Sequence, residues 1–398
     1  MTVFHSRQVR ALRIAVASGV AAALALPLGI ATAWNQLLDS RAATSVTQQG
    51  VAIPDTPAAL IAVTGQGGQL LHVFVATLAA DGVGGTVVLV PIGTATEVAV
   101  PEKQNEPAEV SRRLADVYAQ DGLNGLANEV QGVLDVSFVA VGALGRVELI
   151  NLFAPMGGVN VLLDREVVTV AVDGTPTKLA SVGEETYPID RVVDILLARG
   201  DKEKESLRFA RHREVWNGIV NRVGGGLDIP SEADTTPAGL ADVTNFMRRV
   251  MGGALQVWQL SAAPVLDRSL NPRRLDLYSL DRAEVVMVFA SVAPSALVGG
   301  DAPFTVMIDS PFNDPLVSRA AVAAFLEAGI GVGVMREISA QELPDTMVAA
   351  DGNIAQQITA LLAGSLGAIE ESEWSTPVTG IAAAVTLGSN FAETVRNR

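Results

Sequence analysis

The feature that most constrains this chain is a run of 21 residues without a charged side chain, residues 14–34. Spanning a bilayer takes roughly 20 apolar residues, so the run is long enough to cross a membrane as one helix. Three arginines and no acid precede it. Arginines before the run and an acidic body after it predict a single-pass anchor, with residues 1–13 inside the cell and the bulk of the chain outside.

A cleaved signal peptide is the alternative reading of this run. Ala31, Thr32 and Ala33 have the small-x-small form of a cleavage site. The apolar core of a signal peptide is only about 7–15 residues long, however, so we expect an uncleaved anchor. Residues 35–57 are polar and rich in small side chains, which predicts a linker at the membrane surface.

The composition excludes several classes of function. The formal net charge is −15, which argues against nucleic acid as a partner, because phosphate backbones need a broad basic face. The chain has no cysteine, so disulfides, thiolate catalysis and cysteine-bound metals are excluded. Hydrophobic residues make up 49% of the 398 residues, enough for a substantial core in more than one domain.

Alternating apolar patterns and helical periods predict an α/β fold. Strands are expected at 58–63, 70–78, 85–91, 136–141, 159–163, 167–172, 255–260, 304–309, 331–335, 346–349 and 382–387. Helices are expected at 109–133, 146–153, 189–197, 207–223, 241–251, 316–328 and 354–366. Gly122 and Gly125 allow a break in the first of these helices. We therefore predict a layered α/β/α domain at 58–263, a linker at 264–283, and a small α/β sandwich at 284–393.

Few residues carry recognisable catalytic chemistry. His5 precedes the anchor, and His72 lies in an apolar strand, where a core histidine is the simpler reading. No spacing indicates a metal site, and nothing resembles the Gly-x-Ser-x-Gly motif of serine hydrolases. The glycine cluster at 65–68 follows a strand, but another strand comes next, so it indicates a turn and not a dinucleotide site.

The densest basic run lies at 199–216. Its six Lys and Arg residues face four acids, whereas the rest of the chain has 22 basic and 39 acidic residues. If 207–223 is one helix entered at Ser206, Arg208 and Arg211 share a flank and His212 lies beside Arg208. Two arginines near a helix N-terminus suit a phosphate. The alternative is a solvated surface face, which spacing alone favours.

Several segments in this order resemble the LytR–CpsA–Psr (LCP) family of membrane-anchored cell-envelope proteins. Residues 112–164 are similar to the family's central segment, and 207–216 resembles its Gly-Arg-x-x-Arg-Gln-Gln helix, with Arg208 and Arg211 on the two arginine positions. Residues 304–391 resemble the LytR C-terminal domain. The resemblance implies a transferase that moves glycopolymers from a polyprenyl-pyrophosphate carrier to peptidoglycan, with arginines on the pyrophosphate, acids on Mg²⁺ and an apolar pocket for the lipid.

The departures from the family pattern predict weak or absent catalysis. The family's Ser-Ile-Pro-Arg-Asp reads Val-Pro-Ile-Gly-Thr at 90–94, and the acid that opens the hairpin is replaced near Leu71 and His72. Arg199 alone remains of an Arg-x-Arg motif, and Glu205 stands where the family often has Asp. Loss of one well-placed donor can cost ~100-fold in rate.

We therefore expect a pseudoenzyme of the cell membrane that acts by binding polyprenyl lipid, glycopolymer or an envelope partner protein. The candidate anion-binding residues are Arg208, Arg211 and Arg199, with Glu205 and His212 as weaker candidates. An active transferase that uses Mg²⁺ is the first alternative, and a purely structural envelope protein is the second. No cofactor is expected unless the chain is active.

Overall fold

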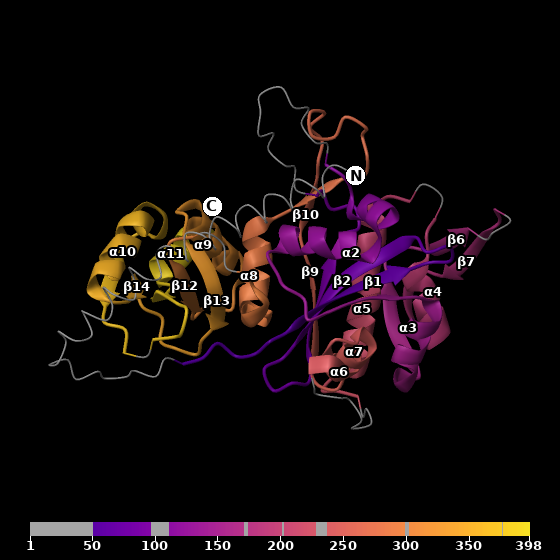
Figure 1. Cartoon of the computed structure of the whole chain (residues 1–398), viewed down its shortest axis with the longest axis horizontal. Helices are drawn as coiled ribbons and strands as arrows, with labels where there is room; N and C mark the ends of the chain where they lie inside the picture. Colours follow the sequence, from indigo (N-terminus) through magenta and orange to yellow (C-terminus); the bar gives the residue numbers. More distant parts are fainter. Residues whose placement is uncertain are drawn as a thin grey trace, which may run out of the picture. The chain divides into compact units, whose positions relative to one another are not determined.

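The first two thirds of the chain are built on a five-stranded sheet with the order β4-β1-β2-β3-β9. Figure 1 labels β1, β2 and β9 of this sheet. The computed structural model describes residues 51–96, 111–170, 174–200, 203–227, 237–298, 302–375 and 377–398. The strands are β1 (Ala58–Thr64), β2 (Leu70–Leu78), β3 (Gly85–Val90), β4 (Ala140–Leu144) and β9 (Leu255–Gln259). β2 is antiparallel to both β1 and β3, as the predicted hairpin requires, while the outer strands β4 and β9 run parallel to their neighbours.

Both faces of this sheet are buried, which explains its nearly continuous apolar strands. In β1, Leu60 and Ala62 face one hydrophobic core, while Ile61 and Val63 face another. The first core is covered by α2 (Leu114–Leu134). The second is covered by four helices: α3 (Arg146–Phe153), α4 (Ile189–Leu197), α5 (Glu205–Val223) and α7 (Val243–Met251). The sheet thus lies between two helical layers, which confirms a layered α/β/α arrangement.

The break predicted in the first helix is present at Gly122. This residue has φ +68° and non-helical backbone angles inside α2, a conformation that glycine adopts without a steric penalty. The two halves of α2 can therefore follow the curved sheet as separate segments. The predicted start at 109 falls outside the described residues, and the described part of the helix begins at Leu114.

Some elements differ from the sequence expectations. The strand expected at 136–141 is β4 at Ala140–Leu144. The segment 167–188 contributes three strands, of which only β6 (Val167–Val170) was expected; β7 (Pro176–Ala180) and β8 (Gly183–Pro188) were not. β8 pairs with β5 (Gly158–Leu163), and β7 pairs with β6. The expected N-cap Ser206 is wrong, because α5 begins at Glu205 with Lys204 as its N-cap.

The predicted linker at 264–283 is partly structured. It overlaps β10 (Ala262–Pro264) and β11 (Tyr278–Leu280), which form a short two-stranded ladder. α8 (Arg282–Val292) follows at once, and its residues 283–290 are all buried. The chain from Gly50 onward forms one compact unit by its contacts. The domain boundary at 264–283 stays a prediction.

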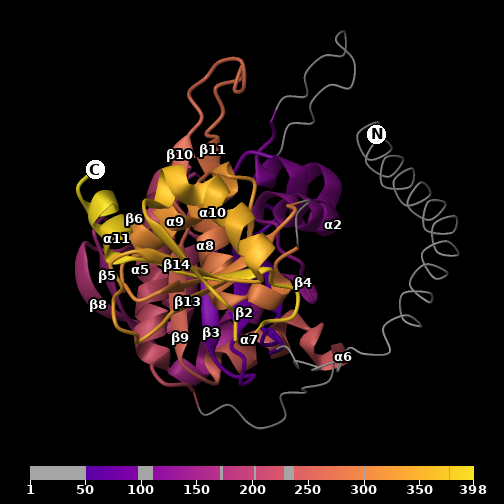
Figure 2. The ribbon, with the colours of Figure 1, turned by 90° about the vertical axis from the view of Figure 1, so that its left-hand side faces the viewer.

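The second sheet has five strands in the order β13-β12-β16-β14-β15. Its strands β13 and β14 are labelled in both Figure 1 and Figure 2. Its strands are β12 (Thr305–Ser310), β13 (Gly331–Glu337), β14 (Thr346–Ala349), β15 (Ile369–Ser372) and β16 (Ala383–Thr386). α9 (Pro315–Glu327), α10 (Gly352–Leu366) and α11 (Ser389–Arg396) pack in the same core as Val306 and Ile308 of β12. The opposite face, with Met307, carries only a small cluster. This is the small α/β sandwich that the sequence predicts; β15 and α11 were not expected.

The predicted membrane anchor at 14–34 lies outside the described residues. Among the helices that the structure describes, none has the length and apolar character needed to cross a bilayer.

Candidate functional site

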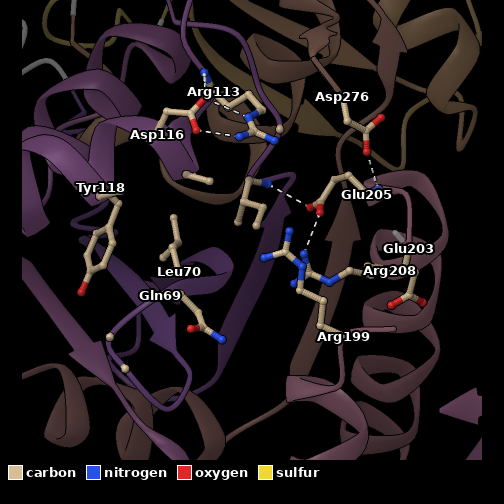
Figure 3. A pocket seen from close by; sticks show the side chains of 16 residues that line it. Gln69, Leu70, Arg113, Asp116, Tyr118, Arg199, Glu203, Glu205, Arg208 and Asp276 are labelled. Carbon is tan, nitrogen blue, oxygen red and sulfur yellow. Dashed lines mark hydrogen bonds and ion pairs between the residues drawn. The ribbon is translucent and has the colours of Figure 1, made fainter. Parts of the chain in front are cut away.

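A polar pocket of about 460 Å³ opens where the β1–β2 turn, the end of β3 and the starts of α2 and α5 meet (Figure 3). In Figure 3, Arg113 and Asp116 of α2 lie on one side, and Arg199, Glu203 and Arg208 lie on the other. The turn contributes Gly67, Gly68 and Gln69, so the glycine cluster is a plain turn, as expected, that also lines a pocket. Segments far apart in the chain thus build one site.

Arg208 lines this pocket but is almost completely buried, with only 2% of its surface exposed. One terminal nitrogen donates to Glu205 Oε2 over 3.1 Å, and the other donates to the Leu71 carbonyl oxygen. Glu205 is held in turn, because its Oε1 accepts the Ile92 N–H over 3.1 Å. Burial lowers the pKa of Arg208 and raises the pKa of Glu205, while each charge favours the ionised form of the other. Arg208 is therefore the centre of a buried, internally paired cluster.

Arg211 does not line the pocket, although its partner Glu203 does. Its guanidinium contacts both carboxylate oxygens of Glu203 and donates to the Ala198 carbonyl oxygen over 2.6 Å. The ion pair with Glu203 is largely shielded from solvent. Arg208 and Arg211 thus share a flank of α5, as predicted, but this flank faces the protein interior. Each arginine has its own carboxylate partner: Glu205 at the start of α5 for Arg208, and Glu203 in the preceding loop for Arg211.

Arg199 behaves differently. It lines the pocket, is exposed, and makes no ion pair with any residue that the structure describes. The third lining arginine, Arg113, is paired with Asp116 through two contacts of 2.8 and 2.6 Å. The hydrogen bond from Arg113 lowers the pKa of Asp116, and the same contact raises the pKa of Arg113. Arg199 is therefore the lining arginine with its charge left for a ligand.

The remaining carboxylates of the pocket are also engaged. Asp276 accepts the backbone N–H of Glu205 over 2.6 Å and the Tyr278 hydroxyl over 2.8 Å. The pocket has three arginines and four carboxylates in all, so it has no excess of positive charge. Within the described ranges, no three His, Asp or Glu side chains are placed to hold a metal ion. The acids present do not fit the Mg²⁺ site that the family resemblance implies, since each already serves an arginine or a backbone N–H.

His212 and His72 form a buried pair on the far side of Arg208. Their ring centroids are 4.1 Å apart, and His72 Nε2 accepts the indole N–H of Trp216 over 3.1 Å. Nδ1 of His72 has no hydrogen bond, and the His212 ring has only the Leu196 backbone nearby as a polar partner. Burial, with the charge of Arg208 as a smaller cause, lowers the pKa of His72 to about 3. Burial also lowers the pKa of His212, although the nearby Leu196 backbone opposes this. Both rings are therefore neutral core residues, as expected for His72 but not for His212.

Aromatic side chains fill the space behind this pair. Trp216 packs edge-on against Phe74 and Phe153, with ring centroids 4.9 and 5.9 Å away. These three side chains and Phe246 have no exposed surface. A wall side chain of an apolar tunnel would keep accessible surface, so these residues form a packed core beside Arg208 and not a lipid channel.

Of the predicted site residues, the structure brings Arg199, Glu205 and Arg208 together in the pocket and leaves Arg211 and His212 outside it. Sequence reasoning missed Arg113, Asp116, Glu203 and Asp276. The sequence could have predicted the Arg113–Asp116 pair, because opposite charges three residues apart at the start of a helix favour a local ion pair. Asp276 lies in the predicted linker, and no local pattern distinguishes it.

Solved structures that resemble this chain include LCP enzymes, the family that the sequence also resembles. B. subtilis TagV has 11% identity and a TM-score of 0.41, over 58% of this chain and 94% of that one. The LytR-Csp2A-Psr enzyme from Actinomyces oris has 16% identity and a TM-score of 0.40, over 59% and 93%. TagT bound to LIIa-WTA has 14% identity and a TM-score of 0.39, over 63% and 94%. No protein-family model and no curated protein matches the chain.

Proposed function

We propose that this chain is a cell-envelope protein related to the LCP glycopolymer transferases that binds a glycopolymer in its polar pocket and does not transfer it. The pairing of Arg208 with Glu205 and the Leu71 carbonyl carries this proposal. A transferase that cleaves a pyrophosphate linkage must stabilise the charge that develops on the leaving phosphate. A buried arginine already neutralised by its own helix cannot supply that stabilisation without breaking its pair.

The composition of the pocket supports a ligand rich in hydroxyl groups. The half-buried carboxylates of Asp116, Glu203 and Asp276 are already paired, but an oxygen that accepts one hydrogen bond can accept a second from a sugar hydroxyl. The Gln69 carbonyl can also accept, while Arg199 and the Gln69 amide can donate. Arg199 can also contact a single anionic group on the same ligand. A diphosphate would instead face four carboxylates against three arginines, two of them already paired. The arrangement therefore favours glycan over pyrophosphate.

The packed core beside Arg208 does not support the lipid-binding part of the sequence prediction, so the proposal is limited to the glycopolymer. The active alternative has one observation in its favour, the unpaired Arg199 in the pocket. The purely structural alternative predicts no ligand at all. We further propose that residues 14–34 anchor the chain in the cell membrane, with the pocket on the outer side, on the basis of the uncharged run and the arginines before it.

One experiment separates these readings. The full chain, purified in detergent, is incubated with a polyprenyl-pyrophosphate-linked glycopolymer and peptidoglycan, with and without Mg²⁺, next to an active LCP enzyme. We expect retention of the glycopolymer without transfer, and reduced retention by Arg199→Ala. Magnesium-dependent transfer would establish the active alternative, and absence of retention would leave the structural one.

A further inference from the structure

The loop between β10 and β11, residues 265–277, carries the most exposed large apolar side chain that the structure describes. Leu266 is 83% exposed and Leu270 is 50% exposed, and Pro272 beside them is exposed as well. The loop extends beyond the β10–β11 ladder in both views (Figures 1 and 2). Single apolar side chains are common on protein surfaces, but two exposed leucines in one short loop indicate a contact surface.

Unpaired arginines accompany these leucines. Arg268, Arg273 and Arg274 are exposed, and none forms an ion pair with a residue that the structure describes. The loop has two acids, of which Asp267 is exposed while Asp276 lies at the base and lines the polar pocket. The exposed part of the loop is therefore positive, whereas the whole chain has a formal net charge of −15.

Hydrogen bonds within the loop hold it in one conformation. The buried Asn271 amide donates to the Val265 and Leu275 carbonyl oxygens over 3.1 and 2.8 Å, and its oxygen accepts the Leu275 N–H over 2.8 Å. Asp267 accepts both the N–H and the hydroxyl of Ser269 over 2.8 Å. The exposed side chains are therefore presented before a partner binds, which lowers the ordering cost of binding.

Exposed leucines between unpaired arginines match an anionic membrane surface. At such a surface, apolar side chains enter the boundary between headgroups and acyl chains, while arginines contact the lipid phosphates. A soluble anionic polymer would satisfy the arginines but leave the leucines in water. Two leucines and a proline also offer far less than the roughly 800 Å² per partner that a stable protein interface buries. The combination therefore favours a membrane over a polymer or a protein.

The proposed anchor keeps the described part of the chain near a membrane. Sixteen residues, 35–50, separate the uncharged run from Val51, the first described residue. They can span at most about 55 Å. A weak contact between loop and lipid is then sufficient, because tethering makes it intramolecular.

We propose that residues 265–277 form a membrane-contact loop, in which the two exposed leucines enter an anionic lipid surface and the three arginines bind its phosphate groups. The inference goes beyond the proposed binding of glycopolymer, and it rests on the proposed anchor, which brings the chain to the membrane. Asp276, at the base of the same hairpin, lines the polar pocket. The contact therefore holds that pocket close to the membrane.

The test measures the depth of a probe in the bilayer. The chain has no cysteine, so a single introduced cysteine carries a fluorophore at one known site. The full chain is labelled at Leu266→Cys, the loop probe, or at Leu361→Cys on α10, the matched control at another exposed leucine. Each protein is reconstituted in phosphatidylcholine vesicles with and without phosphatidylglycerol, and lipids brominated on their acyl chains serve as quenchers. Flotation with the vesicles measures membrane attachment separately.

We expect brominated lipid to quench the loop probe in vesicles that contain phosphatidylglycerol and to leave the α10 probe unchanged. Arg268→Gln with Arg273→Gln should lower the ratio of inserted to free loop about 25-fold, since each arginine near an anionic surface contributes about fivefold. The charge-matched control Arg165→Gln with Arg248→Gln, at exposed arginines outside the loop, should leave this ratio unchanged.

The other outcomes would overturn the proposal in distinguishable ways. Protein that floats with the vesicles while its loop probe stays unquenched would contradict the loop contact and leave the anchor standing. Equal quenching with and without phosphatidylglycerol would overturn the choice of an anionic surface. A response of the loop probe to polyglycerol phosphate in detergent, without quenching in vesicles, would identify an anionic polymer in place of the membrane. Absence of both flotation and quenching would contradict the anchor and the loop contact together.

Discussion

The inner and outer sides of α5 use the same kinds of side chain in opposite ways. On the inner side, Arg208 and Arg211 are buried, and each is paired with a carboxylate and a backbone carbonyl. On the outer side, Arg213 and Asn217 are exposed and line two hollows. Arg208 and Arg211, which stand on the two arginine positions of the family motif, stabilise the fold. Arg213 and Asn217, which lie outside those positions, are open to a ligand.

This difference shows that a motif's residue types do not by themselves decide its role. An arginine acts on a ligand only while its charge is uncompensated, and burial with a partner removes that condition. Four predictions test the contrast between the two sides, beginning with the largest expected effect.

Glu205→Ala should lower the free energy of unfolding by about 3–5 kcal/mol, because it leaves the buried Arg208 without its carboxylate. Denaturant unfolding of the full chain measures this. The double variant Glu205→Leu with Arg208→Met should recover most of the loss, since replacing both members of a buried pair is often tolerated. A cost below about 1 kcal/mol for the single variant would show that the inner pair is not buried in solution.

Acid should destabilise the fold through the inner histidines. Folding lowers the pKa of these histidines below 6.5, the pKa of a histidine in the unfolded chain. The stability that depends on the neutral rings is complete above pH 6.5. It is lost as the pH falls toward the pKa of the folded state, which is about 3 for His72. Each such histidine gives a slope of up to about 1.4 kcal/mol per pH unit in this window.

His212→Leu should remove about half of this slope, because it removes one of the two buried histidines whose pKa is lowered on folding. Unfolding free energies between pH 7 and pH 5 measure the slope in both proteins. Equal slopes would contradict the burial of a neutral His212.

Arg199→Ala should weaken glycopolymer binding by about 10- to 100-fold, since a hydrogen bond to a charged group contributes about 1.5–3 kcal/mol. Its stability should not change, because the side chain is exposed and makes no ion pair with a described residue. Arg165→Ala, at another exposed arginine, is the matched control and should bind as the parent does. Calorimetric titration with the glycopolymer measures the three affinities. Equal affinities for the parent, Arg199→Ala and Arg165→Ala would show that Arg199 does not contact the ligand.

Arg146→Ala should have the smallest effect, within about 1 kcal/mol of unfolding free energy. Arg146 contacts Asp194 over 2.6 Å, as close as many buried pairs, but its side chain is 44% exposed. A cost similar to that of Glu205→Ala would show that contact distance, and not burial, separates the two kinds of pair.

Local patterns predicted most of the strands and helices, and they predicted the break at Gly122, because each depends on near neighbours. The same patterns placed Arg208 on a polar flank of its helix. It is buried because Leu71 and Glu205 supply partners, and the Leu71 carbonyl comes from a strand 137 residues earlier in the chain. Asp276 reaches the pocket through the packing of its segment against α5. Contacts between distant segments leave no periodic trace, so this part of the site could not be read from the sequence.

The central claim is that Arg208 is committed to Glu205 while Arg199 is open to a ligand. The most direct measurement is side-chain NMR of the full chain labelled with nitrogen-15 arginine and titrated with inorganic pyrophosphate, with signals assigned from Arg199→Lys and Arg208→Lys. We predict that the Arg208 signal stays in place throughout, and that any early response comes from Arg199. A shift of the Arg208 signal that saturates with pyrophosphate would contradict the claim and show that Arg208 binds a diphosphate.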